Sequence, residues 1–377
     1  MDNLPKNQYE NALSLTFNQD FSLFSIGTET GFRIYNTSPF NLGYEKRFYG
    51  GIYKCEMSYR SNYLALIGGG RAPKYDNKKV VLYNDALDSI QSEFKFTTPV
   101  LNVKLKKYLI FIVCETKIFV FNIQNSQNID CLDTSINKKG LIAINGSGEK
   151  TIMAYPIEFE DYKKGYVSIK NYKNNKCFPQ YVHEDDISYM AMDYYGLLLA
   201  TSNEKGTLIR IHSCKDGTLL QECKRGKEKA EIIYICFDIN YKYMGVSSDR
   251  KTIHIWKLDN IIERKKKDKL PSSKTIRVND IKNEYKRSIS AFNFQDKDEK
   301  EEVKIKEIKF YKTETSFAKV RLKEPNFIFC FMPNDILIIV TQKGFYYKAI
   351  IEKKGGECYI CDERSISDIK EQNETKK

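Results

Sequence analysis

The sequence predicts an all-β protein, and three observations support this prediction. Short apolar runs rich in Val, Ile, Phe and Tyr recur along the chain, often about 8–12 residues apart. Clusters of Gly, Asn, Asp and Lys separate the runs, as expected for turns. No amphipathic helical pattern interrupts the series. Examples of the expected strands are residues 13–17, 23–26, 32–35, 63–67, 80–83, 100–103, 109–113 and 118–121.

The expected strands group into a repeat. In residues 13–35, a strand leads through a polar turn to a second strand, and a turn with Gly31 leads to a third. The same scheme returns at residues 187–211 and 232–256, which start 45 residues apart. A period of about 40–45 residues with three or four strands per unit is typical of a WD40-type β-propeller. We therefore expect a seven-bladed WD40-type β-propeller.

The length of 377 residues accommodates seven such units and one long insertion. We expect residues 1–366 to form one propeller, with blade 4 the least regular, and residues 367–377 to form a disordered tail. Blade 6 is too long, and its surplus, residues 259–306, is too polar for a core, so we expect a long basic loop. The predicted blades are 12–48, 52–97, 98–137, 140–182, 184–226, 229–322 and 325–365.

The charge of the chain favours anionic partners such as nucleic acid, acidic proteins or a membrane surface. The formal net charge is +12, and residues 264–300 hold 12 Lys and Arg against 6 Asp and Glu. No run of 18 apolar residues occurs, so no membrane-spanning helix is expected. The first residues have no apolar core, which argues against a secretory signal and favours a cytoplasmic protein.

The ten cysteines are expected to be free thiols in a reducing compartment. Cys358 and Cys361 have a CxxC spacing, but no second pair or histidine follows at the spacing of a zinc site. We interpret them as ordinary thiols and expect no metal and no cofactor. The sequence also lacks a Walker loop, a nucleophile elbow and a paired-carboxylate motif, so we do not expect an enzyme.

The stretch from Thr201 to Trp256 carries the clearest functional signal. It holds two parallel phrases, at residues 204–210 and 247–254, that combine small hydroxyl side chains with cations. Between them lies the basic turn Lys224-Arg225-Gly226. Because adjacent residues of an extended strand point in opposite directions, Lys224 and Arg225 are expected to serve two anion pockets, one on each side of the strand.

Several phrases together resemble the PROPPINs, the phosphoinositide-binding β-propellers called WIPI proteins in animals. The hallmark of that family, an aromatic residue or Leu followed by two Arg and a Gly, reads Cys223-Lys224-Arg225-Gly226 here. A Lys in place of the first Arg keeps the charge and loses the bidentate fork. The other phrases that carry the resemblance are Thr30–Thr37, Ile67–Val80, Gly206–Arg210, Gly217–Glu222, Val246–Asp249 and Ser316–Leu322.

The resemblance implies two lipid-binding sites, because a phosphorylated inositol ring needs cations and small hydroxyl donors around it. The chain differs from the family pattern at Asn203, usually Ser, and at Lys251, usually Gly. On the blade 5 side, the first site would contain His183, Ser202, Asn203, Thr207, Arg210 and Lys224. On the blade 6 side, the second site would contain Arg225, Ser247, Ser248, Thr252 and His254. The competing interpretation of the histidines and hydroxyls is that they tie the blades together.

The basic loop offers a further membrane contact, because the matching loop of the family inserts into membranes. Its cations would attract an anionic leaflet, at about 1 kcal/mol each, and its apolar side chains would enter the interface. The alternative is a solvated linker. The expected contact residues are Arg264, Lys265, Lys266, Lys267, Ile289, Phe292 and Phe294.

The resemblance implies a monomeric peripheral membrane effector of autophagy or endolysosomal traffic. It would bind phosphatidylinositol 3-phosphate, or also the 3,5-bisphosphate, on autophagic, endosomal or vacuolar-type membranes, and protein partners on blades 2 and 3. The alternative is a propeller that serves as a protein- or RNA-binding scaffold, with the 26 Tyr stacking on bases. The cations cluster between blades 5 and 6 rather than along a groove, so we expect no nucleic acid.

Overall fold

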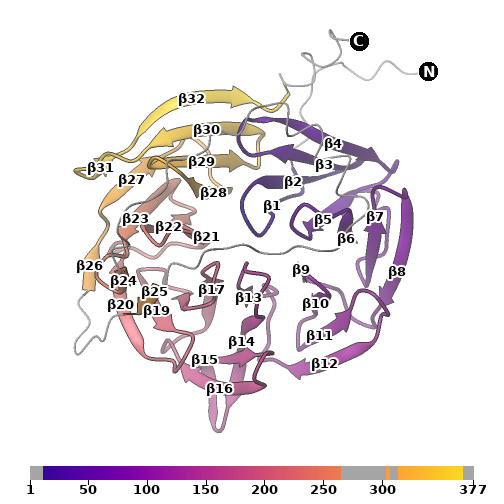
Figure 1. The fold of residues 1–377 in the computed structure, drawn as a ribbon, viewed down its shortest axis with the longest axis horizontal. Helices are drawn as coiled ribbons and strands as arrows, with labels where there is room; N and C mark the ends of the chain where they lie inside the picture. The colour runs from indigo at the N-terminus through magenta and orange to yellow at the C-terminus, as the bar shows by residue number, and fades with distance from the viewer. Residues whose placement is uncertain (1–11, 265–302, 306–312, 368–377) are drawn as a thin grey trace.

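The computed structural model describes residues 12–264, 303–305 and 313–367. Every regular element in these ranges is a β-strand. Seven sheets are arranged around a central axis (Figure 1); five have four antiparallel strands, and two have a fifth strand added in parallel. The prediction of an all-β, seven-bladed β-propeller is therefore confirmed.

The first four blades each consist of four consecutive strands. Blade 4 is the least regular, since its innermost strand has only two residues. Blades 1 and 2 contain β1 (Ser14–Phe17), β2 (Leu23–Thr28), β3 (Gly31–Asn36), β4 (Asn41–Arg47), β5 (Ile52–Met57), β6 (Tyr63–Gly68), β7 (Lys79–Asn84) and β8 (Ser89–Lys95). Blades 3 and 4 contain β9 (Asn102–Lys106), β10 (Leu109–Val113), β11 (Lys117–Asn122), β12 (Asn128–Asp133), β13 (Ala143–Ile144), β14 (Ile152–Phe159), β15 (Tyr162–Asn171) and β16 (Lys176–Tyr181).

The last three blades complete the ring, and two of them take up additional strands. Blade 5 contains β17 (Ile187–Met192), β18 (Leu198–Asn203), β19 (Leu208–Ser213) and β20 (Leu219–Lys224). Blade 6 contains β21 (Ile232–Phe237), β22 (Tyr243–Ser248), β23 (Thr252–Lys257) and β27 (Ala318–Arg321). Blade 7 contains β28 (Phe327–Met332), β29 (Ile336–Thr341), β30 (Phe345–Ile350) and β32 (Tyr359–Ser365).

The hydrophobic core lies between neighbouring blades. The middle strands are covered on both faces, so β22 is buried along its whole length and its residues do not alternate in polarity. One cluster fills the space between blades 5 and 6, where Ile209, Val246 and Trp256 are fully buried. A second cluster, with Val167 and Leu199, fills the space between blades 4 and 5. These two clusters fix the blades that carry the predicted sites.

The ring closes where blade 7 meets the start of blade 1. The backbone N–H of Ala12 donates to the carbonyl of Gln342 at 3.1 Å, and the Gln342 side-chain amide donates back to the Ala12 carbonyl at 2.8 Å. Phe40 of blade 1 stacks on Tyr346 of blade 7, with the ring centroids 4.0 Å apart. Closure thus combines paired hydrogen bonds with aromatic packing.

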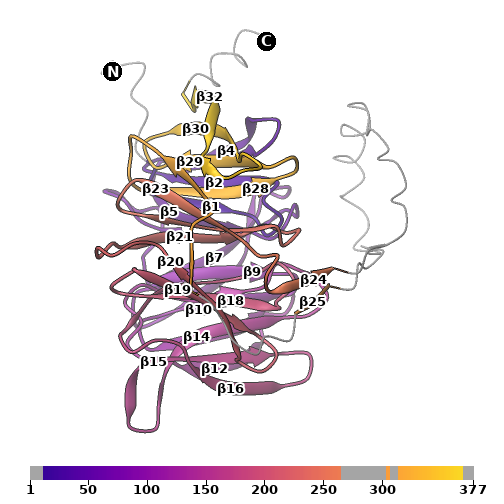
Figure 2. The same ribbon diagram turned by 90° about the vertical axis from the view of Figure 1, so that its left-hand side faces the viewer.

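The insertion in blade 6 lies between β23 and β27, which pair with each other in antiparallel register. Within it, β24 (Ile262–Arg264) pairs with β25 (Val303–Ile305) at one face of the disc (Figure 2). The chain then adds β26 (Thr313–Thr315) in parallel to the outer edge of blade 5. The extra chain therefore continues beyond residue 306. The polar sequence Thr-Glu-Thr has no strand pattern of its own. The strand β26 forms because its backbone pairs with β20.

Candidate anion-binding sites

Lys224 and Arg225 lie at the outer end of blade 5, and their side chains differ in exposure. Lys224 is the last residue of β20 and is exposed, whereas Arg225 is buried. In the register of β19 and β20, Arg210 lies opposite Glu222, and Lys224 follows Glu222 two residues later on the same face. This face turns toward blade 4, because Leu199 on the same face packs in the core between blades 4 and 5.

On the blade 4 side, Arg210 is already held by protein groups. Its Nε lies 3.0 Å from Glu222 Oε2, and its Nη1 donates to the Val182 carbonyl at 2.8 Å. Thr313 donates to the other Glu222 oxygen at 3.0 Å. Arg210 therefore brings a largely neutralised charge to this side. The Lys224 ammonium has no hydrogen-bond or ion-pair partner among the described residues, so it supplies the available charge there.

His183 lies beside Arg210 in the connection between blades 4 and 5. Its side chain is 2% exposed, and Nε2 has no hydrogen-bond partner in the part of the chain that the structure describes. Burial lowers the pKa of His183 to about 4, and the nearby charge of Arg210 adds to this effect. The imidazole is therefore neutral at pH 7 and holds one unsatisfied nitrogen, which is costly unless a ligand or water completes it.

The remaining predicted residues of the first site do not all share one face. Asn203 holds the turn after β18: its amide donates to Asp185 at 3.2 Å, and its Oδ1 accepts from the Gly206 N–H at 3.2 Å. Ser202 lies on the opposite face of β18 from Arg210 and is within 2.9 Å of the Ser188 hydroxyl. Thr207 accepts the Arg225 N–H through its backbone carbonyl at 2.9 Å.

Arg225 is anchored on the blade 6 side. Its Nε donates to the Gly206 carbonyl at 2.6 Å, and a terminal guanidinium nitrogen donates to the Glu228 carbonyl. Gly206 is required here, since it has a φ of +58° and a Cβ would lie 2.0 Å from the Ala230 carbonyl oxygen. Burial lowers the pKa of Arg225, but a guanidinium remains charged at neutral pH. No carboxylate among the described residues forms an ion pair with it.

Three predicted residues of the second site share the face of blade 6 that turns toward blade 5. Ser248 pairs with Thr252 in the register of β22 and β23, and His254 follows on the same face. The Ser248 hydroxyl is fully buried and has no hydrogen-bond partner among the described residues. Ser247 lies on the other face, where it donates to the Tyr234 carbonyl at 3.4 Å. The structure thus brings Ser248, Thr252 and His254 together and leaves Ser247 apart.

His254 is neutral for the same physical reason as His183. Burial lowers its pKa to about 4, and the positive charges of Lys319, Arg225 and Arg321 act in the same direction. Its Nδ1 lies 3.2 Å from the Ser316 hydroxyl, and its ring stacks on Trp256. Three cations around one buried imidazole make this side more electropositive than the blade 4 side.

Lys319 and Arg321 belong to a segment that we call the return arm, residues 313–321. In this arm, Lys319 lies opposite His254 and Arg321 opposite Thr252. The Lys319 ammonium has no partner within the described ranges, whereas Arg321 lies 3.7 Å from Glu357. We did not predict these two cations as site residues. The signal was the alternation Lys319-Val-Arg321, which places both side chains on one face of a strand.

The comparisons with known proteins decide the family. A sequence model of the PROPPIN family matches residues 12–285. The chain belongs to the PROPPIN family. It is 33% identical over 249 residues to autophagy-related protein 18e of Arabidopsis thaliana, which covers 65% of this chain and 66% of that protein. It is 30% identical over 279 residues to SVP1-like protein 2 of Saccharomyces cerevisiae, covering 65% and 62%. The matches thus span about two thirds of each relative.

Solved structures of PROPPINs share the fold of the chain. The crystal structure of Hsv2 from Kluyveromyces marxianus superposes with a TM-score of 0.71 at 18% identity and covers 95% of this chain and 99% of that one. A complex of KlAtg21 with the coiled coil of AgAtg16 gives 0.69 at 19% identity, covering 94% and 99%. The PROPPINs are propeller scaffolds rather than enzymes, in agreement with the prediction for this chain.

The predicted membrane-contact residues of this PROPPIN fall largely outside the described residues. Arg264 is the last residue of β24. Lys265, Lys266, Lys267, Ile289, Phe292 and Phe294 lie outside the described residues. No helix within residues 12–264, 303–305 and 313–367 is long and apolar enough to cross a bilayer.

All ten cysteines are free thiols, and Cys358 is buried whereas Cys361 is exposed.

Proposed function

We propose that this PROPPIN binds phosphatidylinositol 3-phosphate, and also the 3,5-bisphosphate, in two pockets that flank Lys224 and Arg225. One observation carries the proposal. On each side of this dipeptide, a cation without a carboxylate partner accompanies a buried histidine, with His183 and Lys224 on one side and His254 and Arg225 on the other. An oxyanion could accept hydrogen bonds from the Lys224 ammonium on one side and from the buried Ser248 hydroxyl on the other, and it would balance cations that no carboxylate pairs.

The two pockets are expected to differ in strength. The blade 4 side offers Lys224, while Glu222 neutralises Arg210. The blade 6 side offers Arg225 and Lys319 together with the buried Ser248 hydroxyl. Each hydrogen bond to a charged group contributes about 1.5–3 kcal/mol, so the second pocket would bind the headgroup more tightly. The lysine at position 224 further weakens the first pocket, because an ammonium lacks the bidentate fork of an arginine.

Two pockets on one rim would act on a single membrane at the same time. Once one lipid is bound, the second binding step takes place at a high effective concentration, and the overall affinity exceeds that of either pocket. The protein would therefore reside where 3-phosphorylated lipid is dense and leave where it is sparse. The basic residues 264–267 would add attraction to the anionic leaflet, and Ile289, Phe292 and Phe294 would enter its interface.

The role that follows is a monomeric scaffold, recruited peripherally from the cytoplasm to autophagic, endosomal or vacuolar-type membranes. Its relatives carry autophagy-related names, and the related KlAtg21 was solved with the coiled coil of AgAtg16. By this analogy we propose protein partners of autophagy type on blades 2 and 3. The lipid pockets on blades 5 and 6 would leave that part of the ring accessible on a membrane.

Flotation with liposomes that contain each phosphoinositide tests the proposal. The test variant is Lys224→Thr with Arg225→Thr. Its matched control is Lys95→Thr with Arg47→Thr, which removes the same charge from side chains that are 76% and 60% exposed. We expect the wild type and the control to float with 3-phosphorylated lipids and the test variant to remain at the bottom. Because Arg225 also holds backbone carbonyls, Arg225→Lys and a thermal unfolding curve accompany the test.

Two outcomes would contradict the proposal. Equal flotation with all anionic liposomes, unchanged in the test variant, would mean that the basic loop alone drives membrane attraction. Equal loss in the test and control variants would mean that net charge, rather than the two pockets, determines binding. Either result would favour a protein- or RNA-binding scaffold.

A further inference from the structure

Blade 4 carries a cluster of aromatic rings that the proposed lipid sites do not use. The β14–β15 hairpin projects outward beyond β16 (Figures 1 and 2). Toward its tip, Tyr166 packs against Phe159, Tyr162 and Tyr181, with ring centroids 5.4, 5.7 and 5.2 Å apart. Tyr162 is 59% exposed and Tyr181 is 44% exposed. Aromatic rings gathered on a surface are typical of interaction sites.

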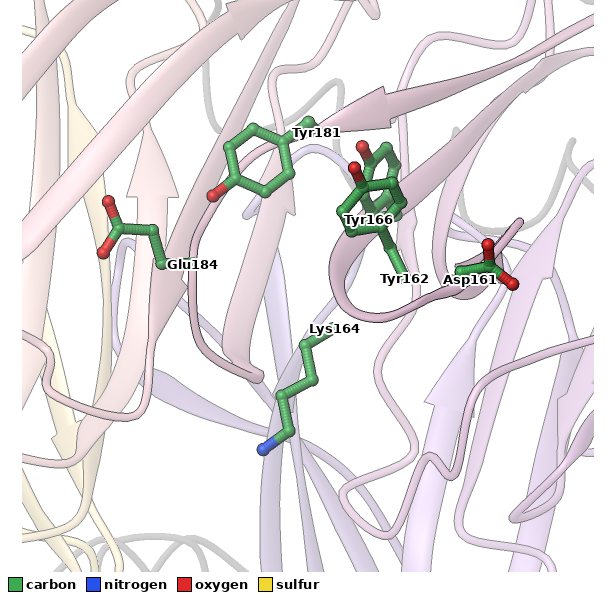
Figure 3. A pocket seen from close by; sticks show the side chains of 6 residues that line it. All are labelled: Asp161, Tyr162, Lys164, Tyr166, Tyr181 and Glu184. Atoms are coloured by element: carbon green, nitrogen blue, oxygen red, sulfur yellow. The ribbon is translucent and has the colours of Figure 1, made fainter.

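The rings line an open pocket of about 570 Å³. Figure 3 shows Tyr181 between Glu184 and the pair of Tyr162 and Tyr166, with Asp161 at the far end beyond this pair and Lys164 directed away from the rings. The Lys164 ammonium lies 2.8 Å from Asp186, which neutralises it. Asp161 and Glu184 have no ion-pair partner among the described residues. The pocket therefore combines tyrosine faces with two available carboxylates.

The local charge is opposite to that of the whole chain. Residues 158–164 and 184–186 contain six Asp and Glu against two Lys, and Lys205 pairs with Asp185 at 2.9 Å, so the rim keeps an acidic excess whereas the chain has a net charge of +12. A cation would be attracted twice, once by the carboxylates and once by the negative faces of the tyrosine rings.

We propose that this pocket binds an arginine side chain in a basic segment of a protein partner. A guanidinium is planar, stacks on aromatic faces and forms paired hydrogen bonds with carboxylates, so it matches the tyrosine walls and Glu184 better than a lysine ammonium does. The site lies on blade 4 and does not depend on the proposed lipid pockets. A membrane-bound molecule would thus offer a separate docking point for protein.

The test uses fluorescence anisotropy with a fluorescein-labelled peptide that has three arginines spaced by alanine, without lipid. Matched peptides carry lysine or glutamate in place of arginine. We expect saturable binding of the arginine peptide, weaker binding of the lysine peptide and none of the glutamate peptide. Because the protein as a whole is positively charged, non-specific attraction of basic peptides is disfavoured. Saturable binding would therefore report a local site.

Variants localise the binding. Tyr162→Ala with Tyr181→Ala should weaken binding of the arginine peptide at least tenfold. Asp161→Asn with Glu184→Gln should weaken it to a similar extent. Tyr49→Ala with Tyr359→Ala is the control, because these tyrosines are 99% and 65% exposed elsewhere on the surface. Thermal unfolding of each variant verifies the fold, and the exposed positions should leave it unchanged.

Three results would overturn the proposal: no saturable binding of the arginine peptide up to about 1 mM, equal weakening in the control, or full binding in the tyrosine variant. The remaining alternative is that the hairpin contacts a membrane, and flotation of the tyrosine variant with phosphatidylserine vesicles tests it. A loss of flotation there, without peptide binding to the wild type, would make the hairpin a membrane contact instead. Failure of the lipid sites would leave the peptide result untouched, since the peptide assay contains no lipid.

Discussion

His254 of β23 lies directly opposite Lys319 of β27, although 64 residues separate them in the sequence. The return arm that carries Lys319 also places Ser316 within 3.2 Å of the His254 ring. The same arm pairs with β20, where Thr315 lies opposite Lys224. The C-terminal end of the insertion thus touches both candidate sites. A change in the return arm would therefore alter the surroundings of both His254 and Lys224.

Lys319→Ala should weaken the second lipid site. The Lys319 ammonium lies on the same side as His254 and has no partner among the described residues. Its removal would take one charge-assisted hydrogen bond from a bound headgroup. Such a bond contributes about 1.5–3 kcal/mol, which corresponds to roughly tenfold or more in affinity. Flotation with phosphatidylinositol 3-phosphate measures the effect. Lys353→Ala, an exposed lysine of blade 7, is the charge-matched control. Equal affinities of the two variants would remove Lys319 from the site.

The stability of the protein should fall as the pH falls from 6.5 to 4. The pKa values of His183 and His254 are lowered by burial to about 4, from an ordinary value of 6.5. Between these pH values the unfolded chain binds protons at these histidines that the native protein does not bind, so protonation favours unfolding. Above pH 6.5 the histidines are neutral in both states, and their contribution to the free energy of unfolding no longer changes with pH. Urea unfolding of wild type and His183→Gln should show a smaller pH dependence in the variant.

Lys251→Gly should stabilise the fold and weaken lipid binding. Lys251 has a φ of +60° in the turn between β22 and β23, a conformation that costs a residue with a Cβ about 1 kcal/mol. Glycine relieves this cost and removes a cation beside the second site. Lys251→Ala removes only the cation. A raised unfolding midpoint for Gly but not for Ala, with equal loss of flotation, is the expected pattern; equal midpoints would contradict the backbone argument.

Tyr241→Phe should destabilise the contact between blades 5 and 6. The Tyr241 hydroxyl donates to the buried Asp193 at 2.6 Å, while the other Asp193 oxygen accepts the backbone N–H groups of Leu197 and Leu198. Loss of one partner of a buried carboxylate costs about 1–3 kcal/mol. Urea unfolding measures it, and Tyr49→Phe, at a fully exposed position, should leave stability unchanged.

The repeat and the number of blades could be predicted because most of the blade strands have a local sequence pattern. The repeats predicted to start at residues 187 and 232 coincide with the first residues of β17 and β21, Ile187 and Ile232. Blade 4 gave a weaker pattern, since the segment after β13 is rich in Gly, Ser and Lys and β13 has two residues. The basic motif predicts Lys224 and Arg225 as site residues, and the family resemblance adds His254.

The surroundings of the site residues depend on contacts between segments that are far apart in the sequence, and local sequence patterns do not predict such contacts. The family resemblance implies Ser202 and Ser247 as pocket residues, yet the strand register places them on the faces opposite to Arg210 and His254. Lys319 joins His254 only because β27 returns after the long insertion. The tyrosine pocket unites the β14–β15 hairpin with Tyr181 and Glu184, which lie about 20 residues further along the chain.

The stoichiometry of headgroup binding tests the central claim most directly. Isothermal titration calorimetry with soluble dibutanoyl phosphatidylinositol 3-phosphate measures it without a membrane, so the basic loop cannot contribute by attraction to a bilayer. We predict two sites of unequal affinity in the wild type, loss of the weaker one in Lys224→Thr, and loss of the stronger one in His254→Ala. Binding of a single headgroup that survives in both variants, or no binding at all, would contradict the account.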